Sequence, residues 1–183
     1  SDVYKETGQT LAETANIYEY IYQTLGKEFT HPIGAPNIAR FRLADMYSSV
    51  TVPKVKEQIE ESMKTEDSTL RVLICTNAFG IGVDCQGVRT VLHWGPPQDL
   101  EAYLQEIGRG GRDGKQTRAH LCYKKKSLAF CDHTMHEFCA STTCRRHFIM
   151  SHFVESYSSA IMGSCKCCDV CKQSCACADC KVE

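Results

Sequence analysis

Residues 70–84 read LRVLICTNAFGIGVD, and this stretch decides the fold. Its first seven residues form a largely apolar run, which is typical of a strand buried on both faces of a parallel sheet. The remainder contains two glycines and ends in an aspartate, as expected of a loop at the carboxyl end of a strand, where α/β sheets bind ligands. Taken alone, such a loop favours a plain structural turn.

The segments on either side alternate between helical and strand periodicity. Apolar residues recur every three or four positions in the predicted helices, and the predicted strands are short apolar runs. The predicted order is helix 10–25, extended segment 39–47, helix 55–64, strand 70–76, strand 88–94, helix 98–107 opened by Pro96 and Pro97, and strand 118–123. Strands that alternate with helices predict an α/β layer, and the pattern becomes helical after a boundary near residue 125.

Length and composition exclude several classes of protein. The 183 residues suffice for one ordinary domain with a smaller satellite, and two full catalytic domains do not fit. Hydrophobic residues at 43% and charged residues at 23% predict a chain that buries a core. Apolar runs are far shorter than the ~20 residues of a membrane-spanning helix, and the first residues lack a signal-peptide core, so we expect neither membrane insertion nor secretion.

Positive charge is concentrated in one region, although the formal net charge is only -1. Residues 1–70 contain seven Lys or Arg against eleven Asp or Glu, whereas residues 105–130 contain seven against two. Within that region, residues 105–114 read QEIGRGGRDG. Four glycines around Arg109 and Arg112 favour a loop that presents guanidinium groups to phosphate, and we expect it, like the first loop, at the carboxyl ends of strands. A surface loop paired with acidic neighbours is the alternative.

Cysteine is the anomaly of the composition, because the chain contains 13 and seven of them lie in its last 19 residues. An odd count without a secretion signal favours metal over disulfides, which are the alternative. Cys165, Cys168 and Cys171 are separated by two-residue spacers, and Cys144 precedes them across a predicted helix. Four thiolates at this spacing predict a closed and therefore structural tetrahedral zinc site.

The remaining cysteines and histidines receive smaller roles. Three of these cysteines are interpreted as part of a solvent-exposed tail, although their thiolates could also compete for the zinc ion or bind a second metal ion together with Cys167: Cys175, Cys177 and Cys180. A second set could also supply metal ligands, but because its members spread over several faces of one predicted helix it is interpreted as helix surface and packing: Cys131, His133, His136 and Cys139. Three more are interpreted as small buried hydrophobes: Cys75, Cys85 and Cys122.

The two loops together resemble motifs V and VI of RecQ-type DNA helicases. The matching residues are TNAFGIGVD at 76–84 and QEIGRGGRDG at 105–114, with HWGP at 93–96 between them. The resemblance covers about residues 10–125. It continues into the family's zinc-binding subdomain, whose four ligand positions match Cys144, Cys165, Cys168 and Cys171, while Cys167 lies in a spacer between ligands. It implies an α/β fold in three parts: a second RecA-like lobe at 1–125, a helical RecQ-type zinc-binding subdomain at 126–172 and a Cys-rich tail at 173–183.

In that family, ATP with Mg²⁺ binds between two lobes, and its hydrolysis moves single-stranded DNA in the 3′ to 5′ direction. By resemblance, Arg112 is the finger that neutralises charge developing on the γ-phosphate, with Arg109 beside it. The other implied nucleotide-site residues are Gly82, Asp84 near the ribose, Gln105 and Glu106, which position the loop, and Gly108. The implied DNA contacts are Thr76, Asn77, Lys124, Lys125, Lys126, Arg145 and Arg146.

Parts of the family pattern do not occur in this sequence. The P-loop lysine motif and the Asp-Glu-x-His box are missing, so we expect this chain alone to be inactive and to need a first helicase lobe as partner, besides ATP and DNA junctions. Residues 1–9 contain no apolar strand, so the sheet is expected to lack its first strand. Gly110 stands where the family usually has Ala. The resemblance further implies work in DNA repair and recombination in the nucleus; the alternative is a non-catalytic, zinc-stabilised remnant that binds nucleic acid or a partner.

Overall fold

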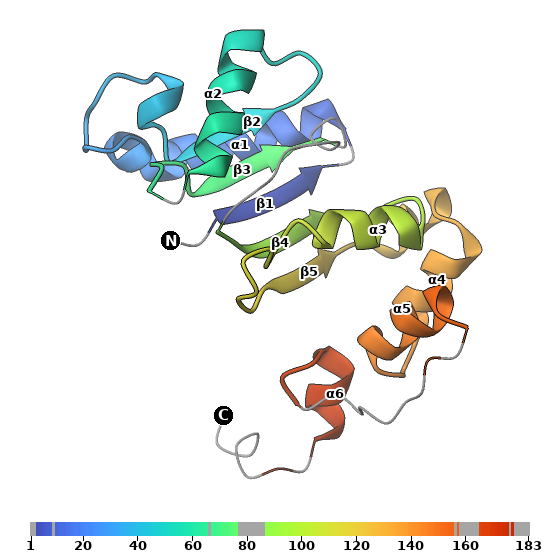
Figure 1. The fold of residues 1–183 in the computed structure, drawn as a ribbon. Helices are drawn as coiled ribbons and strands as arrows, with labels where there is room; N and C mark the ends of the chain where they lie inside the picture. The colour runs from blue at the N-terminus through green and yellow to red at the C-terminus, as the bar shows by residue number, and fades with distance from the viewer. Residues whose placement is uncertain are drawn as a thin grey trace.

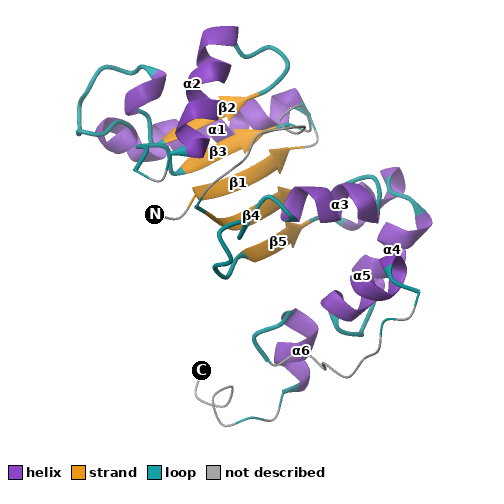
Figure 2. Cartoon of the chain, viewed as in Figure 1, coloured by secondary structure: helices purple, strands orange, loops and turns teal. Residues whose placement is uncertain are grey.

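A parallel five-stranded sheet forms the body of the chain in the computed structural model, which describes residues 3–8, 10–65, 67–76, 87–155, 157, 165–175 and 177 (Figures 1 and 2). The strand order is β2-β3-β1-β4-β5. The strands are β1 (Val3–Gly8), β2 (Ala44–Tyr47), β3 (Val72–Cys75), β4 (Val88–Trp94) and β5 (Arg118–Cys122). All neighbouring pairs are parallel, so the predicted α/β fold class is confirmed.

Within the described residues, six α-helices connect or follow these strands. They are α1 (Leu11–Leu25), α2 (Pro53–Lys64), α3 (Leu100–Ile107), α4 (His133–Ala140), α5 (Arg145–Phe153) and α6 (Asp169–Ser174). Three short 3-10 helices cover Gly26–Phe29, Ala39–Phe41 and Lys125–Phe130, so the segment predicted as extended over 39–47 begins with a 3-10 turn. In the described part of the chain, each helix is too short or too polar to span a lipid bilayer.

The sheet contains a central first strand, so the expectation that it lacks one is wrong. β1 pairs with β3 through Tyr4–Thr7 and with β4 through Val3–Gly8. The error arose because the prediction required an apolar strand, whereas parallel pairing uses backbone N–H and C=O groups that every residue except proline carries. A polar segment such as VYKETG can therefore occupy the middle of the sheet.

The side chains of β3 alternate between two apolar cores, one on each face of the sheet. Leu73 and Cys75 pack in the core that contains Ile59 and Met63 of α2, whereas Ile74 packs in the other core, around Phe29. The helix α1 adds four partly buried side chains to this second core: Ile17, Tyr18, Ile21 and Leu25. Strand β3 is thus covered on both faces, as its apolar sequence predicts, with α2 in front of the sheet and α1 behind it (Figure 1).

Capping residues determine where two of these helices begin. At α1, the Glu13 backbone N–H donates to Thr10 Oγ1 and the Thr10 N–H donates to Glu13 Oε2, each at 3.2 Å, which is a capping box. At α3, the Asp99 carboxylate accepts from the Ala102 N–H at 2.7 Å. The helix therefore begins at Leu100, two residues later than the predicted start at Gln98, because a side-chain cap decides the boundary.

The loop after α3 lies at the amino-terminal edge of the sheet, so the predicted position at the carboxyl ends of the strands is wrong. Helix α3 runs back against the direction of the strands and therefore ends near the point where β4 begins (Figure 1). There the Gly111 N–H donates to Val88 O at 3.2 Å, and Thr117 Oγ1 donates to the same oxygen at 3.1 Å.

The C-terminal helices α4 and α5 pack against α3 rather than against the sheet's centre (Figure 1). Their shared core consists of Leu100, Tyr103, Met135, Phe138 and Ile149. Ring contacts continue through this core, with centroids 5.2 Å apart for Tyr103 and Phe138. The same helix that leads into the glycine-rich loop thus supports the C-terminal part of the chain.

We predict that Gly110→Ala destabilises the loop. A Cβ atom at Gly110 would lie 2.3 Å from Thr117 Cγ2, and Thr117 is held through its hydroxyl by Val88 O. Overpacking of this kind costs about 1–3 kcal/mol in the free energy of unfolding, measurable by urea denaturation. The double variant Gly110→Ala with Thr117→Ser removes the methyl group but keeps the hydroxyl, and should recover most of the loss relative to Thr117→Ser alone. Equal stability of Gly110→Ala and the unaltered chain would contradict this geometry.

Candidate functional site

Backbone hydrogen bonds that extend α3 and an ion pair with β4 shape the glycine-rich loop. Gly108 and Gly110 continue the hydrogen-bond pattern of α3, donating to Leu104 O at 2.9 Å and to Ile107 O at 3.1 Å. Farther along, Arg89 Nη1 donates to Asp113 Oδ1 at 3.0 Å, and this bond holds the pKa of Asp113 below its ordinary value. The loop is therefore anchored at both of its ends.

The two arginines of the loop occupy different environments. Arg109 is buried, with 9% of its surface exposed, whereas Arg112 is exposed. An exposed guanidinium group can approach a phosphate without moving the protein core. Of the two, Arg112 is therefore placed to meet a ligand, and Arg109 is placed to support the loop from inside.

The end of α3 rests on a buried histidine of β4. His93 is fully buried, and its Nε2 lies 2.7 Å from Glu106 Oε2, although the two groups do not have hydrogen-bond orientation. The Tyr103 ring lies against His93, with centroids 5.0 Å apart. This contact places the end of α3 against β4. Gln105, the neighbour of Glu106, is exposed.

The first predicted loop is described only at its beginning. Thr76, at the carboxyl end of β3, is half-buried, and its backbone N–H donates to Tyr47 O at 3.3 Å. The other three residues expected there lie outside the described residues: Asn77, Gly82 and Asp84. Thr76 and the arginine loop thus lie at opposite edges of the sheet.

The predicted basic contacts separate into two groups. Lys124, Lys125 and Lys126 are exposed after β5, as is Arg146 on α5. Arg145 instead binds within the protein, donating from Nε to Asp169 Oδ1 and from Nη2 to Asp169 Oδ2, each at 3.1 Å. The same guanidinium also donates to Phe138 O, so it joins α4 and α5 to α6.

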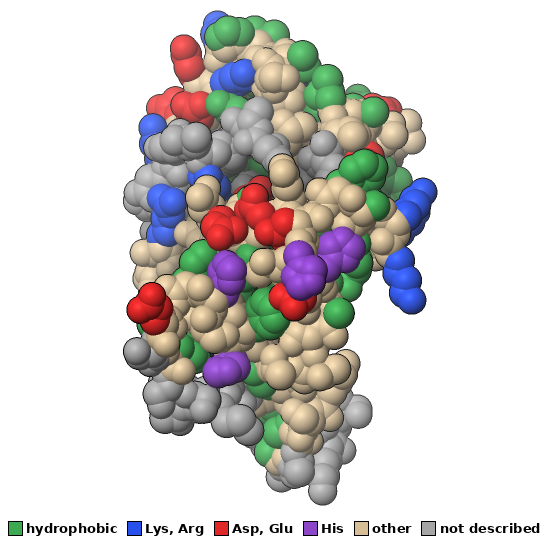
Figure 3. Space-filling model, turned by 90° about the vertical axis from the view of Figure 1, so that its right-hand side faces the viewer, with side chains coloured by type: hydrophobic (Ala, Val, Ile, Leu, Met, Phe, Trp, Pro, Cys, Tyr) green, Lys and Arg blue, Asp and Glu red, His purple; other side chains and the backbone are tan. Residues whose placement is uncertain are grey.

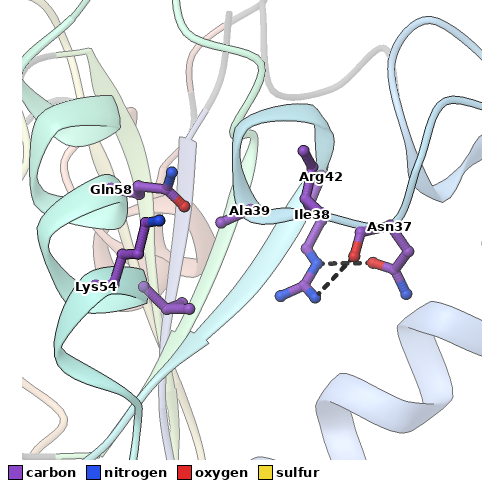
Figure 4. A pocket seen from close by; sticks show the side chains of 7 residues that line it. Asn37, Ile38, Ala39, Arg42, Lys54 and Gln58 are labelled. Atoms are coloured by element: carbon purple, nitrogen blue, oxygen red, sulfur yellow. Dashed lines mark hydrogen bonds between the residues drawn. The ribbon is translucent and has the colours of Figure 1, made fainter.

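One face of the described part of the chain is acidic rather than basic at its centre. Figure 3 shows a face on which acidic and histidine side chains gather at the centre, with lysine and arginine side chains mainly towards its edges. A pocket of about 280 Å³ lies between α2 and the 3-10 turn at 39–41, and none of its lining residues was predicted to function (Figure 4). Its Arg42 donates from Nε to Asn37 Oδ1 at 2.7 Å and so lies against the protein's own loop.

Four cysteines of the C-terminal part form a first thiolate group, in which all sulfur atoms lie within 4.8 Å of one another: Cys144, Cys167, Cys168 and Cys171. All four side chains are half-buried. The sulfur atoms of Cys144 and Cys167 are 3.7 Å apart, close to the ~3.8 Å edge of a tetrahedron with zinc–sulfur bonds of ~2.3 Å. The donor set therefore fits a tetrahedral zinc ion.

One member of this group differs from the predicted ligand set. Cys144, Cys168 and Cys171 lie together as expected, but Cys167 joins them where Cys165 was expected. Cys165 instead belongs to a second thiolate group with Cys175 and Cys177. The turn at 165–168 places neighbouring thiols in different groups, which residue spacing cannot reveal.

The thiols of the first group differ in acidity. Burial alone would raise the pKa of Cys144, but hydrogen bonds from the His147 N–H and from the thiols of Cys171 and Cys167 lower it to about 7. Burial and hydrogen bonds with Cys144 and Cys168 raise the pKa of Cys171. One thiol of the group therefore loses its proton near neutral pH. The thiolate that results is the form that binds a metal.

Comparison with protein families accounts for both parts of the chain. The helicase conserved C-terminal domain matches residues 21–114, which is more than half of the chain, and the RecQ zinc-binding family matches residues 97–172. Among solved structures, a DEAD box protein from the hyperthermophile Methanococcus jannaschii is similar, with a TM-score of 0.53 and 17% identity over 83% of this chain and 33% of that one. This likeness supports the fold alone.

Curated relatives give the same assignment. The mouse (Mus musculus) bifunctional 3'-5' exonuclease/ATP-dependent helicase WRN is 32% identical over 146 residues, which are 65% of this chain and 10% of the relative. The ATP-dependent DNA helicase RecQ of Bacillus subtilis is 32% identical over 124 residues, which are 57% of this chain and 20% of the relative. This chain thus spans a small part of either relative. It belongs to the helicase conserved C-terminal domain family, in the RecQ type that carries a zinc-binding domain.

Proposed function

We propose that this chain is the second motor lobe of an ATP-dependent 3′ to 5′ DNA helicase and supplies Arg112 as its arginine finger. The observation that carries the proposal is the exposure of Arg112 on a glycine-rich loop whose residues on either side of Arg112 are hydrogen-bonded to β4. An anchored loop presents the guanidinium in one place, and an exposed guanidinium can pair with phosphate oxygens contributed from outside the chain.

The role follows from the chemistry of phosphoryl transfer. Negative charge moves onto phosphate oxygens in the transition state, so a positioned arginine stabilises it more than the ground state. The P-loop lysine and the acidic residues that bind Mg²⁺ would come from a first lobe, since this sequence carries neither motif. Arg109 and Glu106 act from inside as positioning residues: burial holds Arg109, and the His93 contact holds Glu106.

DNA is the proposed polymer, in keeping with the names of the relatives, which include ATP-dependent DNA helicases. Those names favour a part of an ATP-driven helicase over a non-catalytic remnant as the identity of this chain. Four exposed cations are the proposed phosphate contacts: Lys124, Lys125, Lys126 and Arg146. Thr76 would contact the DNA backbone at the opposite edge from Arg112. A helicase of this kind would act on nuclear DNA in repair and recombination.

Zinc is the proposed occupant of the first thiolate group, with Cys144, Cys167, Cys168 and Cys171 as ligands. When bound, it supplies structure rather than catalysis, because four thiolates leave no open position. Cys168 caps α6 and Cys171 lies within it, while Cys144 immediately precedes α5. The ion would therefore join the two helices beside the Arg145–Asp169 ion pair.

We predict that Arg112→Ala, in the enzyme that contains both lobes, lowers DNA-stimulated ATP turnover by about 10³- to 10⁵-fold. Affinity for single-stranded DNA should stay within about twofold, because the finger acts on nucleotide. Steady-state ATPase assays and fluorescence anisotropy measure the two quantities. Arg118→Ala, another exposed arginine six residues away, is the matched control and should retain turnover. Retained turnover in Arg112→Ala would assign the finger elsewhere.

We predict that Cys144→Ser lowers the zinc content by one equivalent per chain and unfolds the segment around α5 and α6. Structural zinc contributes its binding energy to folding, so loss of a ligand removes local stability. Elemental analysis gives the zinc content, and hydrogen exchange gives local protection. Cys131→Ser, which changes a thiol outside both groups, should keep the metal. Full zinc content in Cys144→Ser would exclude this residue as a ligand.

We predict different effects for two adjacent arginines. Arg146→Ala, like replacement of Lys124–Lys126, should weaken DNA binding uniformly across sequences and reduce the salt slope by roughly 0.7–0.9 per lost phosphate contact. Arg145→Ala should instead reduce the stability of the α5–α6 region, since its guanidinium binds Asp169 and Phe138. Salt-dependent titrations and thermal melts separate the two outcomes. The reverse pattern would contradict the assignment.

A further inference from the structure

The second thiolate group lies outside the segment that the RecQ zinc-binding family covers. That family match ends at residue 172, whereas Cys175 and Cys177 follow it. Together with Cys165 they bring three sulfur atoms within 4.8 Å of one another, and all three side chains are half-buried. The grouping is thus distinct from the first one and shares no residue with it.

The distances in this group match metal ligation better than a disulfide. The sulfur atoms of Cys177 and Cys165 are 3.7 Å apart, as are those of Cys144 and Cys167 in the first group. A disulfide requires ~2.05 Å, whereas two thiolates on one tetrahedral zinc lie ~3.8 Å apart. The Cys177 N–H also donates to Cys175 Sγ at 3.4 Å, so these two residues of the group are in direct contact.

The fold explains why a second site forms beside the first. Helix α6 has only six residues, too few to be stable alone, and its two ends lie in different groups. Cys168 caps its beginning and belongs to the first group, whereas Cys175 caps its end and belongs to the second. Cys165 joins the second group from the turn before the helix, so the first group is complete without it.

We propose that Cys165, Cys175 and Cys177 form a second zinc site, separate from the one formed by the first group. Three described thiolates bind the ion and leave its fourth position to water or another small ligand. The second site would fasten the end of α6 to the turn at 165–168, while the first site fastens its beginning. Because it has one thiolate fewer, the second ion exchanges faster than the first.

The test is the metal content of the full chain, reduced and loaded with Zn²⁺, measured by elemental analysis after removal of free metal. The unaltered chain should bind two equivalents, and Cys175→Ser with Cys177→Ser should bind one. Cys144→Ser with Cys171→Ser should remove the other equivalent. Cys131→Ser with Cys139→Ser is the matched control for two lost thiols outside both groups, and should keep two equivalents.

Replacement of zinc by cobalt(II) shows which of the two metal sites remains in a variant. In the Cys175→Ser and Cys177→Ser variant, the charge-transfer spectrum of a four-thiolate cobalt site should persist, which also shows that this part of the chain folds. In a chelator competition, the unaltered chain should release one equivalent before the other, and this early release should be absent from that variant.

Three results would overturn the proposal. They are one equivalent in the unaltered chain, two equivalents in the Cys175→Ser and Cys177→Ser variant, or loss of the four-thiolate cobalt spectrum in that variant. A chain that binds no zinc at all would overturn the first site as well, so the two assignments fail in distinguishable ways. Replacing Cys165 alone provides an independent check, because it should remove the early-released equivalent and leave the four-thiolate spectrum intact.

Discussion

The carbonyl oxygen of Val88 is the point on which the arginine loop depends. It accepts hydrogen bonds from the Gly111 N–H and from Thr117 Oγ1, and so ties both sides of the loop to the first residue of β4. Val88 itself is buried in the core beside α2, and β4 is held between β1 and β5. The position of an exposed arginine is thus set by a strand that cannot move without disturbing the sheet.

The C-terminal part of the chain is organised differently, because it has little apolar core of its own. Helices α4 and α5 pack on α3 through Tyr103, Phe138 and Ile149, but α6 lies beyond this core (Figure 1). Burial of apolar area cannot hold a six-residue helix that has none of its residues buried. Zinc ions in the two proposed sites at its ends would supply, together with the Arg145–Asp169 ion pair, what packing does not.

Much of this fold could be predicted from the sequence, and the errors about β1 and Cys122 share one cause. The strands at 72–75, 88–94 and 118–122 coincide with short apolar runs, and α1 with a regular helical repeat. Strand β1 was missed because backbone pairing leaves no mark in a polar sequence. Cys122 was expected to be buried but is exposed, because β5 is an edge strand. Both of these errors concern long-range placement, about which local patterns say nothing.

The same distinction applies to the functional residues. Residue types and glycine spacing indicated a phosphate loop, but the different burial of Arg109 and Arg112 depends on how α3 meets β4. Residue spacing also indicated a thiolate site, but the division of Cys165 and Cys167 between two groups depends on one turn. The parallel sheet adds a constraint that neither motif contains: Thr76 leaves β3 at one edge, and the loop of Arg112 is tied to β4 at the other. If Thr76 contacts DNA and Arg112 contacts nucleotide as proposed, coupling between the two sites within this chain would pass through the sheet or through the chain that joins these two strands, and would be a property of the lobe as a whole.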